Sequence, residues 1–167
     1  QDKIESQLNL YLENNLIEWS NRKNVRGDFF VWLYKLRNTF LGIRANTIRK
    51  MIPSRYSKNM AALNELLADA KKSNVKVLIY IPPIRIDAPL PYQLDLYKNF
   101  KDDLQKICEK EKNLFYFANF DSIIPGNLWG YKESTNFFDR REVDYMHFQY
   151  RGHQILADSI YKYISTF

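Results

Sequence analysis

Asp144 and His147 are the residues whose type and spacing point most directly to chemistry. Three positions separate them, just ahead of a predicted helix. In a turn, this offset lets the carboxylate accept a hydrogen bond from one ring nitrogen, which fixes the imidazole tautomer and leaves the other nitrogen as a general base. Such a base activates a hydroxyl nucleophile, which is barely ionised at neutral pH. The same spacing also fits a turn or capping aspartate followed by a loop histidine, so the surrounding elements must decide.

From residue 58 onward, the pattern alternates between helix and strand. A β-branched apolar run closed by Pro82 and Pro83 is typical of a strand covered on both faces. Apolar residues at helical spacing predict the helices, with Ser57 or Asn59 as a cap for the first. The expected elements are a helix at about 60–72, a strand at 75–81, a helix at 92–110, a strand at 114–120, a long loop at 121–146 and a helix at 150–165.

This alternation predicts an α/β fold, with right-handed βαβ units, a parallel sheet and helices on both faces. Functional loops are then expected after the strands, at 82–91 and 121–146. Two parallel strands do not make a stable sheet by themselves. We therefore expect that the N-terminal third hides strands, that sequence before Gln1 supplies them, or that a partner completes the sheet.

Residues 1–57 are expected to be a helical and irregular segment packed on the core, within a single domain overall. Helix is favoured over strand at 29–41 because Leu33, Leu36, Phe40 and Ile43 recur at helical spacing. Pro53 breaks the pattern and predicts the start of a loop. Residues 58–167 are expected to form the C-terminal part of the α/β domain.

The C-terminal block resembles the closing block of SGNH/GDSL hydrolases, in which an Asp-x-x-His pair precedes a Leu-Ala-containing helix. The matching residues are Asp144, His147, Phe148, Gly152, His153, Leu156, Ala157 and Ile160. The run Lys-Val-Leu-Ile-Tyr-Ile-Pro-Pro at 76–83 is similar to the family strand that precedes a substrate-facing loop. The resemblance covers residues 58–167, about two thirds of the chain. It implies a three-layer α/β/α, flavodoxin-like fold that is incomplete at the N-terminus, with a helical N-terminal insert.

By this resemblance, His147 is the catalytic base and Asp144 its orienting partner, whereas His153 is structural and Gly152 permits close packing. The family's Gly-Asp-Ser block and its oxyanion-donor blocks are absent. Ser122 follows the second predicted strand but lacks the Gly-Asp-Ser setting. The nucleophilic serine is therefore expected upstream of this chain.

The resemblance implies a serine ester hydrolase or O-acyltransferase acting on an acylated carbohydrate, a cell-envelope polymer or a small ester, without a cofactor. Larger relatives include membrane-linked proteins that acylate teichoic acids and alginate. By analogy, the location is extracytoplasmic, in the periplasm or at the cell surface, and a missing N-terminal anchor would associate the protein with a membrane. The alternative is a non-catalytic SGNH-like module that binds an anionic polymer or a protein partner.

Composition limits other functions. The net charge of +6 and the pI of about 9.3 favour anionic partners, but the basic residues are scattered and carry no nucleic-acid-binding motif, so no nucleic acid is expected.

Asp144, His147 and Asp139 could be assembled as metal ligands, but no metal is expected, because there are two histidines and no cysteine cluster. No phosphate-binding glycine motif follows either strand. Cys108 lies on the apolar stripe of a predicted helix, which indicates a structural thiol. The aromatic residues of the long loop, Trp129, Tyr131, Phe137, Phe138 and Tyr145, suit either packing or a ligand platform.

Overall fold

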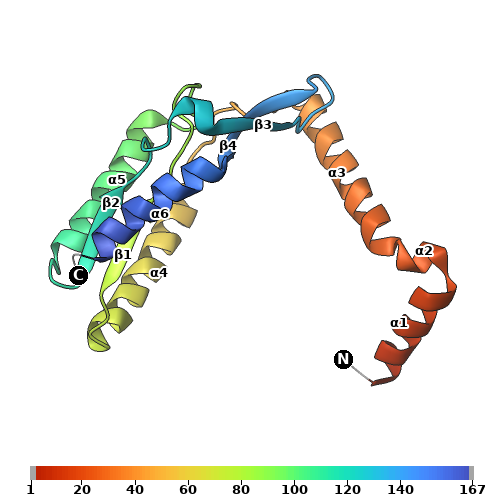
Figure 1. The fold of residues 1–167 in the computed structure, drawn as a ribbon, viewed down its shortest axis with the longest axis horizontal. Helices are drawn as coiled ribbons and strands as arrows, with labels where there is room; N and C mark the ends of the chain where they lie inside the picture. Colours follow the sequence, from red (N-terminus) through yellow and green to blue (C-terminus); the bar gives the residue numbers. More distant parts are fainter. Residues whose placement is uncertain (1–2, 166–167) are drawn as a thin grey trace. The chain divides into compact units, whose positions relative to one another are not determined.

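The computed structural model describes residues 3–165, which divide into two compact units (Figure 1). One unit contains the chain up to Arg44 together with Ser134–Arg140. The other contains Ala45–Glu133 and the chain from Arg141 onward. The second unit carries both predicted strands and the Asp144–His147 pair.

The first unit is mainly helical, with α1 at Lys3–Asn15, α2 at Ile17–Ser20 and α3 at Arg22–Phe40. The helix expected at 29–41 is confirmed. Gly42, at φ 63°, ends α3 in the left-handed conformation that glycine adopts without strain. The buried Asn38 amide donates to the carbonyl oxygen of Thr135 at 2.9 Å, which ties α3 to the 134–140 segment.

The second unit follows the expected alternation and adds a hairpin. Its helix α4 begins at Pro53, so the expectation of a loop there is wrong: proline at the first helical position lacks only an N–H that would have no partner inside the helix. The elements are α4 (Pro53–Lys72), β1 (Val77–Ile81), α5 (Leu94–Glu109), β2 (Phe115–Asn119), the 3-10 helix η1 (Gly126–Leu128), β3 (Trp129–Glu133), β4 (Arg141–Phe148) and α6 (Tyr150–Ile164).

Strands β1 and β2 form a two-stranded parallel sheet, in register from Val77 opposite Phe115 to Ile81 opposite Asn119. Side chains alternate across a strand, so Val77, Ile79, Phe115 and Phe117 lie on one face. They pack with α4 and α5 around Leu67, Cys108 and Phe115. On the opposite face of the sheet, the ring of Phe120 contacts Tyr80. It also contacts Tyr163 of α6, at 5.5 Å between ring centroids. The prediction of an α/β fold with a parallel sheet is confirmed.

The expectation of one long loop at 121–146 is wrong. Strands β3 and β4 form an antiparallel pair, with Tyr131 opposite Val143 and Glu133 opposite Arg141. Cross-strand pairing supplies order that neither strand's own sequence predicts. Among residues 3–165, no helix is both long enough and apolar enough to cross a membrane.

Candidate functional site

The structure brings Asp144 and His147 into direct contact at the end of β4. Nδ1 of His147 lies 2.9 Å from Oδ2 of Asp144. The two side chains differ sharply in exposure, at 83% for His147 and 9% for Asp144. A carboxylate that accepts a hydrogen bond from Nδ1–H leaves Nε2 of the ring as a proton acceptor. The arrangement therefore suits a general base that is open to solvent and oriented by a buried acid.

The Asp144 carboxylate is held by three hydrogen bonds. Besides the imidazole, its Oδ1 accepts the backbone N–H groups of Met146 at 2.9 Å and His147 at 3.1 Å. Burial on its own would raise the pKa of Asp144, but these backbone and imidazole hydrogen bonds outweigh it and lower the pKa. The group is therefore ionised at neutral pH, as an orienting partner of histidine requires.

The pair lies in a bulge of β4. Trp129 is opposite Phe148 and Tyr131 is opposite Val143, so β4 advances five positions where β3 advances two. The extra residues of β4 include the segment from Asp144 to His147. A bulge interrupts the ladder and redirects side chains locally. This is how a strand can bury the carboxylate and expose the imidazole three residues later.

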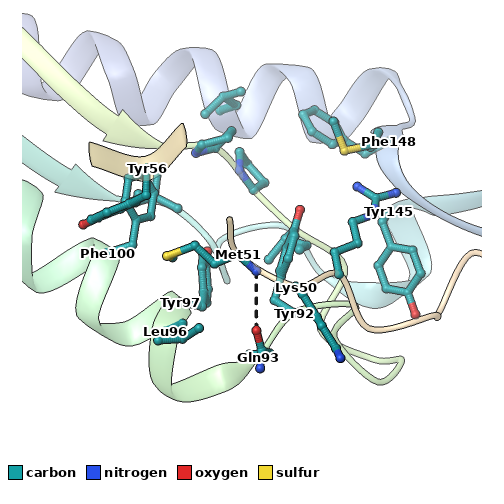
Figure 2. A pocket seen from close by; sticks show the side chains of 17 residues that line it. Lys50, Met51, Tyr56, Tyr92, Gln93, Leu96, Tyr97, Phe100, Tyr145 and Phe148 are labelled. Carbon is teal, nitrogen blue, oxygen red and sulfur yellow. Dashed lines mark hydrogen bonds between the residues drawn. The ribbon is translucent and has the colours of Figure 1, made fainter. Parts of the chain in front are cut away.

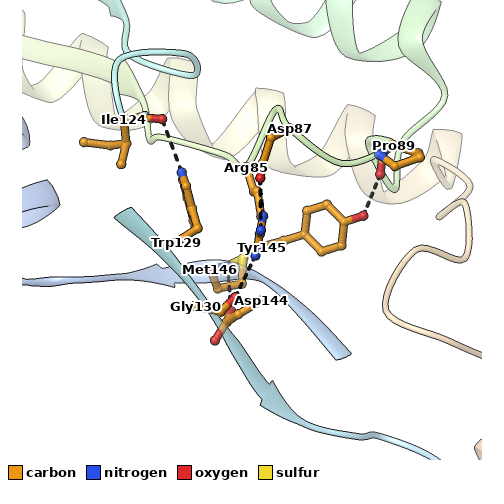
Figure 3. A network of polar contacts seen from close by, with 9 residues as sticks. All are labelled: Arg85, Asp87, Pro89, Ile124, Trp129, Gly130, Asp144, Tyr145 and Met146. Carbon is orange, nitrogen blue, oxygen red and sulfur yellow. Dashed lines mark hydrogen bonds and ion pairs between the residues drawn. The ribbon is translucent and has the colours of Figure 1, made fainter. Parts of the chain in front are cut away.

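The segment after β1 is joined to this hairpin by polar contacts (Figure 3). Arg85 donates from Nη1 to the carbonyl oxygen of Gly130 in β3 at 2.7 Å. Its Nε and Nη2 form a two-point pair with Asp87, at 2.7 and 3.0 Å. The Tyr145 hydroxyl donates to the carbonyl oxygen of Pro89 at 2.6 Å. The hairpin and the loop at the carboxyl end of β1 are thus fixed together at two points.

An apolar cavity of about 640 Å³ lies beside the pair (Figure 2). Its walls include Ile81 at the end of β1, Phe100 of α5, Leu156 of α6, and Met146 and Phe148, which flank His147 in sequence. His147 itself is not part of the wall. The volume falls within the range of small-molecule sites, which are mostly apolar with a few polar groups.

The polar side chains of this cavity are those of its tyrosines, of Gln93 and of two basic residues, Arg49 and Lys50. Burial, together with the neighbouring Asp103 carboxylate, raises the pKa of Tyr56 to about 12, and its hydroxyl donates to Asp103 at 2.7 Å. Burial and the charge of Asp121 raise the pKa of Tyr97 further still. These phenols remain neutral across the physiological range, so they add no charge to a largely apolar wall whose charged side chains are Arg49 and Lys50.

The other residues singled out from the sequence have structural contacts. The ring of His153 packs on Phe148, with centroids 4.4 Å apart. Cys108 is buried in the core, and Asp139 pairs with Arg44 at 3.9 Å. Within residues 3–165, no group of three or more metal-ligating side chains is present.

The aromatic residues expected in the long loop have different environments. Trp129 is buried and donates from Nε1 to the carbonyl oxygen of Ile124 at 3.3 Å, and Tyr145 is buried as well. Tyr131, Phe137 and Phe138 are exposed. The packing interpretation therefore holds for two of the five.

No nucleophile accompanies the pair in the described part of the chain. Ser122 is exposed in the turn after β2, and no serine, threonine or cysteine among residues 3–165 hydrogen-bonds the imidazole of His147. Sequence reasoning also missed Arg85 and the contact of Tyr145 with Pro89. Only the position of Arg85 directly after a buried strand could have drawn attention to it.

Comparisons with protein-family models, curated proteins and solved structures find no match to this chain.

Proposed function

We propose that the chain belongs to an SGNH-like serine ester hydrolase or O-acyltransferase, whose flavodoxin-like three-layer domain is completed by sequence preceding the chain. The observation that carries the proposal is the hydrogen bond between Asp144 and His147 beside a parallel sheet. Helices α4 and α5 pack on one face of the sheet formed by β1 and β2, and α6 contacts the side chains of the other face. These contacts support the layered arrangement.

In the proposed mechanism, Nε2 of His147 takes the proton of a serine hydroxyl as that oxygen attacks the ester carbonyl. Asp144 accepts the hydrogen bond from Nδ1–H and stabilises the imidazolium that forms. The imidazolium then gives its proton to the leaving alkoxide, and an acyl-serine remains. A water molecule or a second hydroxyl accepts the acyl group, with His147 again acting as base.

The proposed substrate is an acylated carbohydrate or cell-envelope polymer outside the cytoplasm. The cavity beside the pair would hold the acyl portion, because most of its lining residues are apolar or aromatic. The net charge of +6 would favour an anionic polymer over a neutral one. No nucleic acid, metal or organic cofactor is required by these steps.

The test is turnover of p-nitrophenyl acetate by the full-length gene product. His147→Ala should reduce kcat by about a millionfold, and Asp144→Asn should reduce it by about ten-thousandfold through the wrong tautomer. His153→Ala is the matched control, because it removes the other histidine of the chain, which packs on Phe148 and does not hydrogen-bond Asp144. Equal activity of the His147 and His153 variants would rule out the proposed mechanism.

One observation favours a second function, that of a non-catalytic binding module. The exposed imidazole has no hydroxyl partner among the described residues. Such a module would bind an anionic polymer such as alginate with strong dependence on salt, because the attraction is between exposed charges. His147→Ala would leave that binding unchanged, and the wild-type protein would not hydrolyse the ester.

A further inference from the structure

The bulge in β4 interrupts the hydrogen bonding of the neighbouring strand, β3. Gly130 lies between Trp129 and Tyr131, which pair with β4 on either side of the bulge, so it faces the bulged segment and not a regular ladder partner. A backbone carbonyl at such a break needs another donor when water does not reach it. Nη1 of Arg85 meets this need at 2.7 Å.

Arg85 is itself firmly placed. Its side chain is 7% exposed, and two of its nitrogens are paired with the Asp87 carboxylate. Its guanidinium carbon lies 5.1 Å from the ring centroid of Tyr131, the next residue of β3. Asp87 is in turn confined by Gly126, where an added Cβ would lie 2.8 Å from the Asp87 Cγ. A planar guanidinium held by a two-point pair has little freedom to move.

The segment that carries Arg85 is anchored to the sheet. The backbone N–H of Ile84 donates to the carbonyl oxygen of Asp121 at 3.0 Å, just beyond β2. Further along, Pro89 accepts the hydroxyl of Tyr145, the residue after Asp144. The segment from Ile84 to Pro89 therefore links the bulge to the ends of β1 and β2, through the Arg85 side chain and the backbone groups of Ile84 and Pro89.

We propose that Arg85 is a positioning residue for the Asp144–His147 pair. By binding the Gly130 carbonyl opposite the bulge, it holds the backbone turn in which Asp144 accepts the N–H groups of Met146 and His147. Without it, the Asp144 carboxylate would no longer face Nδ1 of His147. The inference rests on the proposed function only where it assigns Arg85 a part in catalysis, because the hydrogen bond between Asp144 and His147 is present without substrate.

The experiment is ¹⁵N NMR of the imidazole, which reports which ring nitrogen carries the proton. The chain has two histidines, so His153→Gln identifies the His147 signals. In the wild type, we expect the Nδ1-protonated tautomer at pH 8. Arg85→Met should lose this preference and shift His147 toward the Nε2-protonated tautomer, whereas Arg85→Lys should retain it in part, because one ammonium donor can reach Gly130.

Lys71→Met is the matched control. Lys71 pairs with Glu111 and makes no hydrogen bond or ion pair with the hairpin or with residues 84–89, so its loss should leave the tautomer unchanged. An Arg85→Met protein that folds and keeps the wild-type tautomer would overturn the inference. If that variant does not fold, Asp87→Asn, which frees the guanidinium, should produce a smaller shift in the same direction, and no shift would overturn it.

The same spectra separate this inference from the proposed function. A wild-type protein without the Nδ1-protonated tautomer contradicts the Asp144–His147 pair itself. A wild-type protein with it, whose tautomer is insensitive to every Arg85 and Asp87 variant, contradicts only the role of Arg85.

Discussion

His147 and Asp144 are joined by one hydrogen bond, yet the imidazole is exposed and the carboxylate is buried. This asymmetry makes the acid the structural member of the pair. Asp144 also closes the turn of the bulge by accepting two backbone N–H groups, whereas the His147 side chain makes no other hydrogen bond or ion pair among residues 3–165. Changes at the two positions should therefore affect stability very differently.

The first prediction concerns stability against pH. Because the pKa of Asp144 is lower in the folded protein than in the unfolded chain, its contribution is fully present above the unfolded value of about 3.9. That contribution is lost as the pH falls from there through the lower folded value. Asp144→Asn should thus flatten the decline in the free energy of unfolding below about pH 4, measured by urea titration at several pH values.

At pH 7, Asp144→Asn should cost about 1–3 kcal/mol, because charge-assisted hydrogen bonds to a buried group are replaced by weaker neutral ones. His147→Ala should cost less, since its ring is exposed. Asp158→Asn, at an exposed position of α6, is the control and should keep the wild-type pH profile. A profile of Asp144→Asn that matches the wild type would contradict this account.

The parallel strands and the contact between Asp144 and His147 could be predicted because each depends on local sequence. The strands are apolar and β-branched, and an offset of three residues in a turn brings a carboxylate to an imidazole. The helices that alternate with these strands could also be predicted, because their apolar residues recur at helical spacing. These features do not require knowledge of distant partners.

The hairpin and the role of Arg85 could not be predicted, because both depend on contacts between residues that are distant in sequence. Strand β3 contains Gly130 and Lys132 and lacks a clear alternation, and the bulge places the polar Asp144 in the interior of β4. Arg85 binds a backbone carbonyl 45 residues away, and no side-chain type at position 130 could signal it. Both depend on tertiary pairing that a single sequence does not encode locally.

A second prediction concerns the core between α4, α5 and the parallel sheet. Leu67 is 3% exposed and packs with Cys108 and Phe115, so Leu67→Ala should cost about 2–5 kcal/mol of unfolding free energy. Leu66→Ala is a matched control, because the neighbouring leucine is 59% exposed and should cost less than about 1 kcal/mol. Equal losses in thermal or urea unfolding would show that this core is not formed.

Cys108 offers a separate probe of the same core. Burial raises the pKa of its thiol, and the adjacent Glu109 adds to the effect, so the reactive thiolate is scarce as well as inaccessible. We expect labelling by a thiol reagent at pH 8 to be slow in the native protein and rapid in denaturant. Leu67→Ala should accelerate native-state labelling, whereas Leu66→Ala should not. Rapid labelling of the wild type would place Cys108 at the surface.

The last prediction compares two glycines in helices. Glycine to alanine within a helix usually stabilises by up to about 1 kcal/mol. Gly27 in α3 has open space around it, so Gly27→Ala should show this gain. At Gly152 in α6, an added Cβ would lie 2.7 Å from Cδ2 of Phe148, whose ring is confined by Trp129 and His153. Gly152→Ala should therefore destabilise by about 1–3 kcal/mol in urea unfolding. A gain at both positions would mean that α6 does not pack against Phe148, at the end of β4, as closely as the structure shows.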